Sequence, residues 1–437
     1  SDGMSEMLLG RMALQPDVRT ISRSAAFSFK DRRQDPAAVG KELGVDNVLT
    51  GSVSKDGDRI TVKLDLRDVN SGRPPMSTSF TETGEHVVRL QEAIAAWVRN
   101  SLELSPGATA GKKSYTDNND AFQLYLQAEY HRQKSTPADQ LTAIDMYQKA
   151  LQLDPEYALA YQGLSLTYRS SPAYGAMPPA EAFPKAKETA QKALAIDPSL
   201  STPYVTLASV TATYDWDYAN AEEQYKQAIE RGINNSEAHY SYGNFLVAMG
   251  RTDDALREYG IARQLDPPSL NIPTNIGWAL YIAGRYDEAS TQIKQVIAKD
   301  PSFARAYMNL GEITQEQGRV DEAIGYFKKA KELSSDPLAD MAMGHAYAAA
   351  GRRAEAMRIA ADLEEKVRRK EVSPFLPAVV YAGLNEKDKA FYWLERAYQE
   401  RSNWLTLIKV GRRLTNLHGD PRFDDLLKRV GFIEKRL

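Results

Sequence analysis

The chain has 437 residues and contains no cysteine. This absence excludes a disulfide framework, thiolate metal sites and cysteine nucleophiles together. The formal net charge is only -3, so the chain lacks the excess of one sign that attracts nucleic acid or an anionic lipid surface. It also lacks an apolar run of the roughly 18 residues that a membrane-spanning helix needs. The best candidate, residues 93–98, ends at Arg99, and no signal-peptide pattern is visible. We therefore expect no nucleic-acid partner and no membrane span within this sequence.

Motifs for catalysis or ligand binding are equally scarce. The glycine-containing stretch at residues 107–114 has the wrong spacing for a phosphate-binding loop. Adjacent carboxylates such as Asp253 and Asp254 point in different directions on a helix. The histidines show no pair four residues apart, as metal ligands on one helix would; they are His86, His131, His239, His345 and His418. We predict no catalytic residue, no cofactor, no metal ligand and no enzyme activity. A hydrolase within the first hundred residues would need a nucleophile and base that the sequence does not reveal.

The second half of the chain contains an internal repeat. A Gly–Arg pair recurs every 33 or 34 residues, at Gly250-Arg251, Gly284-Arg285, Gly318-Arg319 and Gly351-Arg352. An alanine follows each of these glycines by five residues, at Ala255, Ala289, Ala323 and Ala356. A second glycine precedes each by seven residues, at Gly243, Gly277, Gly311 and Gly344. Three features with one period predict stacked helical hairpins.

Each recurring residue has an expected role in a hairpin. Two helices approach closely only where side chains are small, so Gly243 is expected to meet Ala255, and the other repeats follow suit. The glycine of each Gly–Arg pair can take a positive φ and end the first helix. The large residues four positions after the alanine are expected to fill the space between hairpins; they are Tyr259, Ile293 and Phe327. Asp–Pro pairs beginning at residues 154, 197, 266, 300 and 336 are expected to cap the next helix and end the previous one.

This pattern resembles the tetratricopeptide repeat (TPR), which the first half carries with insertions. By this period, about eight hairpins extend from residue 118 to residue 402. Residues 403–437 are expected to form a C-terminal capping helix region that covers the last exposed face, as the end of a solenoid requires. The predicted fold is therefore mainly α, a right-handed TPR α-solenoid with a small α/β domain before it.

The first hundred residues follow a different pattern. We expect helices at residues 2–14, 35–43 and 84–104, and strands at residues 18–22, 48–54, 60–69 and 76–81. Asp56-Gly57 is a strong hairpin signal between two of these strands. The predicted domains are an α/β domain at 1–104, a linker at 105–117, the TPR array at 118–402 and the capping region at 403–437.

The same region resembles the TolB-amino-terminal-like domain that precedes TPRs in bacterial signalling proteins. The resemblance rests on residues 1–6, 18–23, 40–45 and 49–53, and continues at residues 214–217, 275–278, 420–423 and 426–431. It implies an α/β domain, here without the family's first strand. It also implies a kinase, cyclase or winged-helix output domain upstream, since relatives often carry one.

The TPR resemblance further implies that the first helices of successive hairpins line a concave groove that binds a peptide or protein. Spacing of four and then three residues along these helices selects Tyr240, Asn244, Val247, Thr274, Trp278, Tyr281, Met308, Glu312, Gln315 and His345. Trp278 and Tyr281 either face a partner there or pack against neighbouring helices.

The sequence therefore favours a non-enzymatic interaction or sensory scaffold of a bacterial signalling or regulatory protein. The alternative is a structural, self-assembling protein that forms homo-oligomers, either by end-to-end TPR stacking or by strand complementation of the α/β domain. The compartment stays open. It is periplasmic if a membrane span lies upstream, and cytoplasmic otherwise.

Overall fold

A computed structural model of the chain describes residues 18, 20–21, 29, 35–83, 87–104, 116–134, 136–173, 175–334 and 336–432. It forms two compact units. The first comprises Ser1–Leu207, Lys226–Ala238 and Gln264–Ser269. The second comprises Ala208–Tyr225, His239–Arg263 and Leu270–Leu437.

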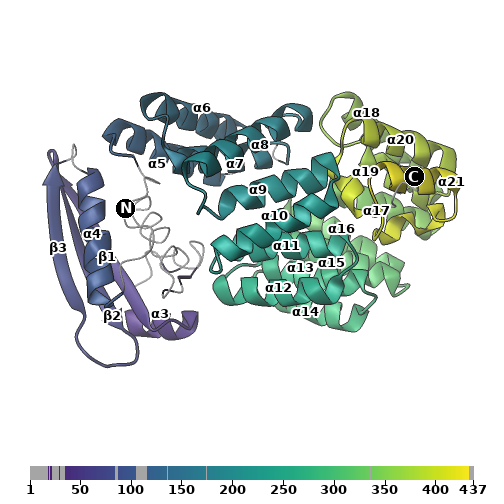
Figure 1. Ribbon diagram of the computed structural model, residues 1–437. Helices are drawn as coiled ribbons and strands as arrows, with labels where there is room; N and C mark the ends of the chain where they lie inside the picture. Colours follow the sequence, from purple (N-terminus) through teal and green to yellow (C-terminus); the bar gives the residue numbers. More distant parts are fainter. Residues whose placement is uncertain are drawn as a thin grey trace. The chain divides into compact units, whose positions relative to one another are not determined.

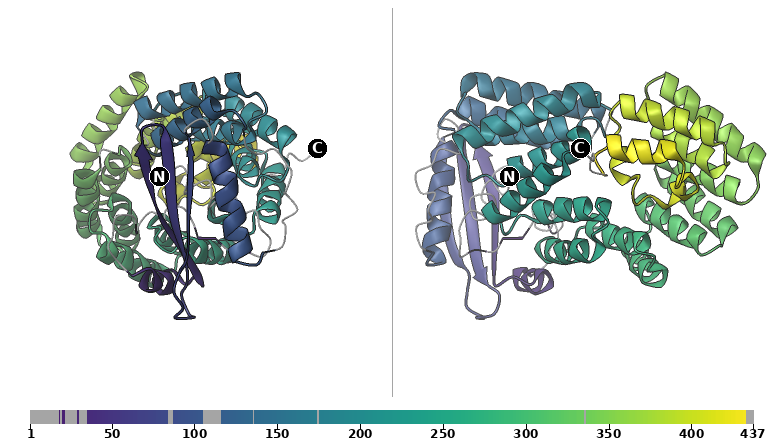
Figure 2. Two further views of the ribbon diagram at one scale, coloured as in Figure 1. Left: turned by 90° about the vertical axis from the view of Figure 1, so that its left-hand side faces the viewer. Right: turned by 45° about the vertical axis from the view of Figure 1, so that its right-hand side comes forward.

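The first unit contains a three-stranded antiparallel sheet in the order β1–β2–β3 (Figures 1 and 2). The strands are β1 (Asn47–Asp56), β2 (Arg59–Asp68) and β3 (Met76–Thr83). In the central strand, Val62, Leu64 and Leu66 alternate with exposed residues and are buried. Helix α4 (Val87–Ser101) contacts β3 and buries Leu90 and Ile94. The apolar face of the sheet and that of the helix therefore make the core of this region.

The predicted hairpin at Asp56-Gly57 is confirmed, because Asp56 pairs with Arg59 and Gly57 has a φ of 58°. The three strands agree with the predicted ranges within two residues at each end. Helix α3 (Pro36–Leu43) also begins as predicted, with the Asp35 carboxylate accepting a hydrogen bond from the Ala37 amide at 3.4 Å. The helix predicted at 2–14 lies outside the described residues. Of the strand predicted at 18–22, residues 18, 20 and 21 are described and have no strand assignment.

Eight helical hairpins follow in the described residues, in agreement with the predicted number, and those of one unit lie side by side in Figure 1. They are α5 (Asn119–Lys134) with α6 (Pro137–Leu153), α7 (Ala158–Ser170) with α8 (Pro179–Ile196), α9 (Thr202–Val210) with α10 (Tyr218–Arg231), α11 (Ser236–Ala248) with α12 (Thr252–Leu265), α13 (Asn271–Ile282) with α14 (Tyr286–Lys299), α15 (Ala304–Glu316) with α16 (Val320–Leu333), α17 (Leu338–Ala349) with α18 (Arg353–Arg368), and α19 (Phe375–Gly383) with α20 (Lys387–Gln399). The fold is a helical-hairpin solenoid with a small sheet before it. The limits predicted for the domains stay predictions.

The turn glycines behave as predicted. Gly250, Gly284, Gly318 and Gly351 have φ values between 71° and 82°, which end the first helices. The predicted alanine neighbour is found at Gly277, where a Cβ would lie 3.5 Å from the Ala289 carbonyl oxygen. The nearest neighbour of Gly243, however, is the large residue and not the predicted alanine. A Cβ on Gly243 would lie 2.5 Å from the ring of Tyr259, four residues further along the second helix. The large residue thus fills the space over the glycine inside its own hairpin, because a helical side chain leans over the preceding turn.

Three of the Asp–Pro pairs act differently from the prediction, whereas the Asp336 carboxylate accepts a hydrogen bond from the amide of Leu338, the first residue of α17, at 2.9 Å, as predicted. Asp154, Asp197 and Asp300 are the C-terminal caps of the preceding helices α6, α8 and α14. Their carboxylates accept amide hydrogen bonds from residues two positions later, such as Ser302 from Asp300 at 2.8 Å. The next helix begins four or five residues after the aspartate, so these side chains organise the turn rather than cap that helix.

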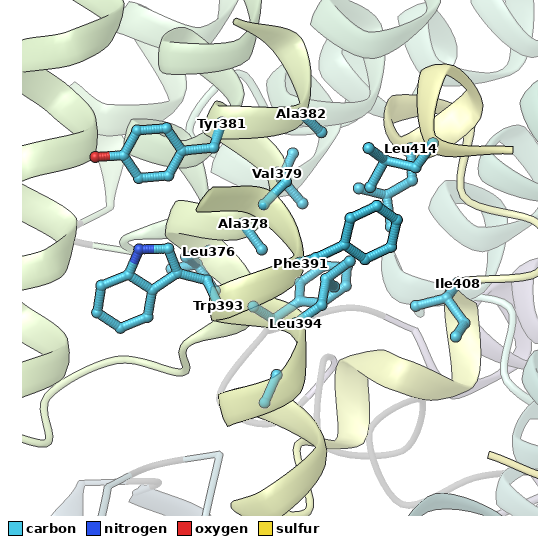
Figure 3. Packing of buried hydrophobic residues seen from close by; sticks show 14 of the residues in the cluster. Leu376, Ala378, Val379, Tyr381, Ala382, Phe391, Trp393, Leu394, Ile408 and Leu414 are labelled. Atoms are coloured by element: carbon cyan, nitrogen blue, oxygen red, sulfur yellow. The ribbon is translucent and has the colours of Figure 1, made fainter. Parts of the chain in front are cut away.

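The end of the chain folds back onto the second unit. The 3₁₀ turns η3 (Asn403–Leu407) and η4 (Arg412–Leu417) come before the terminal helix α21 (Pro421–Arg429). Ile408 and Leu414 enter a buried apolar cluster with Phe391 and Leu394 of α20 (Figure 3). A capping helix was predicted for this region, and α21 fits it. The two 3₁₀ turns were not predicted.

The same segment reaches the first residues of the second unit. The Arg401 guanidinium donates a hydrogen bond to the Tyr214 carbonyl at 3.2 Å. The rings of Trp216 and Tyr398 stack at 5.1 Å, and those of Tyr218 and Phe432 stack at 4.8 Å. Figure 2 shows the yellow C-terminal segment against the green helices of this unit. The C-terminal end of the second unit is therefore tied to its N-terminal end.

The contact between a glycine and an aromatic ring predicts how a glycine-to-alanine substitution changes the free energy of unfolding. A Cβ on Gly311 would come closer than 3.0 Å to the Phe327 ring, whereas a Cβ on Gly325, in the neighbouring helix α16, would meet no atom within 4 Å. Gly311→Ala should lower the free energy of unfolding by about 1–3 kcal/mol because of overpacking. Gly325→Ala should raise it by up to about 1 kcal/mol through helix propensity. Urea unfolding followed by circular dichroism measures both, and equal effects of the two substitutions would contradict this packing.

Candidate interaction surface

The residues selected by spacing lie on four first helices of the second unit. Tyr240, Asn244 and Val247 are on α11, Thr274, Trp278 and Tyr281 on α13, Met308, Glu312 and Gln315 on α15, and His345 on α17. We call these positions, with the side chains that connect them, the first-helix surface. Val247 and Thr274 are fully buried, so neither presents its side chain to solvent. Trp278 is partly buried against the core of α13–α15, and Tyr281 is 4% exposed.

A row of polar side chains connects α11, α13 and α15 along this surface. The Tyr259 hydroxyl donates to the Asn244 carbonyl oxygen at 2.7 Å. The Asn275 amide donates to the Tyr240 hydroxyl at 3.0 Å and also to Asn244. The Arg305 guanidinium donates to the Asn275 carbonyl oxygen at 2.7 Å. The spacing pattern selected Tyr240 and Asn244. It did not select Asn275, which connects them to α13, or Arg305, which connects Asn275 to α15.

Arg412, at the start of η4, lies at the C-terminal end of α13. Its guanidinium donates to the carbonyls of Tyr281 and Ile282, at 3.2 and 2.9 Å. These carbonyls belong to the last turn of α13, which carries partial negative charge, and the Tyr281 carbonyl also accepts the Gly284 amide at 2.9 Å. The guanidinium carbon also lies 5.4 Å from the centre of the Tyr286 ring. The Nη1 atom of Arg412 lies 4.0 Å from the Glu316 Oε2. We call this arrangement the Arg412 site.

Arg413 occupies an adjacent position on α15 and α17. It pairs with the Glu312 carboxylate at 2.8 Å, and the two side chains retain only 13% and 14% exposure. Its guanidinium carbon lies 5.8 Å from the centre of the Phe327 ring. A buried charge pair of this kind is costly to break by removing one partner, because the other charge stays buried. We call this arrangement the Arg413 site.

His345 is held in its neutral form beside Arg413. The Gln315 side-chain amide lies 2.8 Å from the His345 Nδ1, and the Arg413 backbone carbonyl accepts a hydrogen bond from the imidazole. An amide N–H donates to Nδ1 only when that nitrogen has no proton, so the proton is on Nε2. Burial, with the Arg413 charge adding to it, lowers the pKa of His345 to about 3.

Part of the chain matches a known family of helical repeats. A family model described as the tetratricopeptide repeat matches residues 217–269 and 274–339. The hairpins within these residues are tetratricopeptide repeats. The yeast Tom70 crystal structure resembles the chain with a TM-score of 0.47 and 14% identity, over 79% of this chain and 77% of that one.

Two relatives match the chain over only part of their own length. Putative adenylate cyclase 3 of Rhizobium meliloti (strain 1021) is 26% identical over 171 residues, which is 38% of this chain and 29% of that protein. The transcriptional regulator HilA of Salmonella typhimurium is 24% identical over 303 residues, 68% of this chain and 47% of that protein. The chain thus spans less than half the length of these two relatives.

The described part of the chain contains neither a candidate metal cluster nor a candidate membrane-spanning helix. No group of three or more histidine and acidic side chains is placed there to hold a metal ion. None of the described helices is both long enough and apolar enough to cross a membrane. The first-helix surface, with its polar row and its two arginine sites, is the candidate interaction surface.

The main residues that spacing missed are Arg412 and Arg413. A repeat pattern identifies residues on the helices that repeat, and these two arginines lie in a segment after the array. The one available signal was a basic pair, flanked by apolar residues, in the region assigned to capping.

The neutral state of His345 predicts its response to pH. The imidazole should keep a constant NMR chemical shift from pH 8 to pH 5, since its folded-state pKa is depressed to about 3. Its contribution to stability is present above pH 6.5 and is lost as pH falls toward 3, because the unfolded chain then binds a proton that the folded chain rejects. The His345→Gln spectrum assigns the signal. A titration midpoint near the ordinary value of 6.5 would contradict the burial.

Proposed function

We propose that the chain is a non-enzymatic interaction module of a bacterial signalling or regulatory protein, which binds a peptide or protein on its concave TPR surface. The observation that carries this proposal is the row of polar side chains that joins α11, α13 and α15. Side chains joined across consecutive first helices form one continuous, pre-organised surface. Such a surface loses less conformational entropy on binding a partner, because its own side chains are already ordered.

The relatives support the regulatory context. One bears the name of an adenylate cyclase and the other of a transcriptional regulator, and the chain matches only part of each. A region of similar sequence in two proteins whose names differ in activity is consistent with a recognition module, because function lies in sites carried by a fold rather than in the fold itself. The sheet at residues 47–83 with helices α3 and α4 agrees with the TolB-amino-terminal-like domain that we propose for residues 1–104.

Tyr240 and Trp278 are the aromatic residues with which we propose the surface contacts a partner. Both are partly exposed, and each ring offers a large contact area with few rotatable bonds. Tyr281 does not serve this purpose directly, because it is buried and its carbonyl already accepts a hydrogen bond from Arg412.

The test is a pair of substitutions with a matched control. The full chain, the Tyr240→Ala/Trp278→Ala variant and the Tyr392→Ala variant are used to capture the native partner from an extract of the source bacterium. Tyr392 lies on α20, outside the first-helix surface, and is 58% exposed. We expect the double variant to bind the captured partner at least about tenfold more weakly, with Tyr392→Ala unchanged. Unchanged binding by the double variant would remove the assignment.

A further inference from the structure

The two arginine sites of the first-helix surface have a composition that recognises guanidinium groups in general. The Arg412 site combines two helix-terminal carbonyls with a tyrosine ring and a nearby carboxylate. The Arg413 site combines a largely buried carboxylate with a phenylalanine ring. Carbonyl and carboxylate acceptors match the N–H donors of a guanidinium, and aromatic faces attract its delocalised charge.

These sites lie on the TPR helices, whereas the arginines that fill them come from a separate segment. The acceptors belong to α13 and α15, and the rings to α14 and α16. The segment follows α20 and crosses from the end of α13 to the end of α19, where the Asn416 amide contacts the Ala382 carbonyl. It therefore lies on the TPR surface in the way that a bound peptide would.

The apolar anchors of the segment are distinct from its arginines. Leu405, Ile408 and Leu417 are fully buried in the cluster around α19 and α20. The side chain of Arg412 is 28% exposed to solvent, and that of Arg413 is 13% exposed. The guanidinium groups lie at the ends of side chains that are not part of this apolar cluster. Substitution of the two arginines therefore removes the guanidinium groups and keeps the apolar anchors of the segment.

We propose that the first-helix surface is a binding site for paired arginines, filled in cis by Arg412 and Arg413, and that it accepts an arginine-containing segment of a protein partner in their place. This proposal rests on the proposed function, because it names the chemistry of the partner that the TPR surface binds. The internal arginines act at a high effective concentration, so they compete with any external segment.

The test uses the full chain and a fluorescent peptide with the sequence of residues 407–418. Arg412→Ala/Arg413→Ala vacates both sites and keeps the apolar anchors. By fluorescence anisotropy, this variant should bind the peptide at least about tenfold more tightly than the wild-type chain does, since the internal competitor is gone. Adding Glu312→Gln and Glu316→Gln should abolish the gain.

Three controls define the result. A peptide with both arginines replaced by alanine should lose the gain, and one with lysines should lose most of it, because lysine lacks the planar fork. Arg422→Ala/Arg429→Ala, which removes two arginines of α21 outside the sites, should bind the peptide as the wild type does. If the alanine variant does not fold by circular dichroism, Arg412→Lys/Arg413→Lys carries the test, with a smaller gain expected.

Equal binding of the peptide by the vacated and wild-type chains, or binding that does not depend on the peptide's arginines, would overturn the proposal. Its failure differs from failure of the proposed function. A native partner that needs Tyr240 and Trp278 but is indifferent to the arginine sites would leave the proposed function standing and refute this inference. An arginine peptide captured by the vacated sites, with no partner lost from the Tyr240→Ala/Trp278→Ala variant, would support this inference and refute the aromatic contact surface of the proposed function.

Discussion

The contact of a glycine in one helix with a large side chain of the next is the constraint on which the TPR surface depends. At Gly243, Gly277 and Gly311 the space for a Cβ is already taken by Tyr259, Ile293 and Phe327. This packing draws the two helices of a hairpin together and fixes how their other faces point. Tyr259 shows the consequence, since its ring covers Gly243 and its hydroxyl holds Asn244 on the first-helix surface. One side chain thus takes part both in the core packing and in the polar row of the first-helix surface.

The C-terminal segment makes the second unit a closed arrangement. It contacts the TPR helices through Arg412 and Arg413, and Phe432 after α21 stacks on Tyr218 near the beginning of the unit, where Tyr398 of α20 also stacks on Trp216. Trp216 has a φ of 60°, an uncommon value for a large residue, and it follows the π-helical turn Thr211–Asp215. Departures from regular helix therefore coincide with the place where the two ends of the unit meet.

The sequence predicted the repeat well because its strongest signals are local and periodic. The turn glycines and the number of hairpins depend on backbone conformation within about 34 residues, and a period reveals them. The nearest neighbour of Gly243 was not predicted, because the direction in which a helical side chain leans decides the contact, and spacing alone does not include it. The role of Asp154, Asp197 and Asp300 was also predicted incorrectly, because the same residue type serves as a helix cap and as a turn former.

The contacts of the first-helix surface were predicted only in part because they are not periodic. Spacing selected Glu312 and His345, but their common partner Arg413 comes from a segment about 70–100 residues later that no repeat pattern includes. Val247 and Thr274 fitted the same spacing and are buried instead. A three-to-four residue spacing selects a side of a helix, and it does not tell whether solvent, a neighbouring helix or a distant segment covers that side.

The most direct measurement of the central claim, that the chain's own segment occupies the TPR surface, is a double-mutant cycle between Glu312 and Arg413. Free energies of unfolding in urea are compared for the wild type, Glu312→Gln, Arg413→Met and the double variant. A largely buried pair predicts a coupling energy of about 1–3 kcal/mol. The exposed pair of Arg396 and Glu400 on α20, treated in the same way, should give about 0.3–0.5 kcal/mol. A coupling between Glu312 and Arg413 no larger than that of the exposed pair would contradict the account.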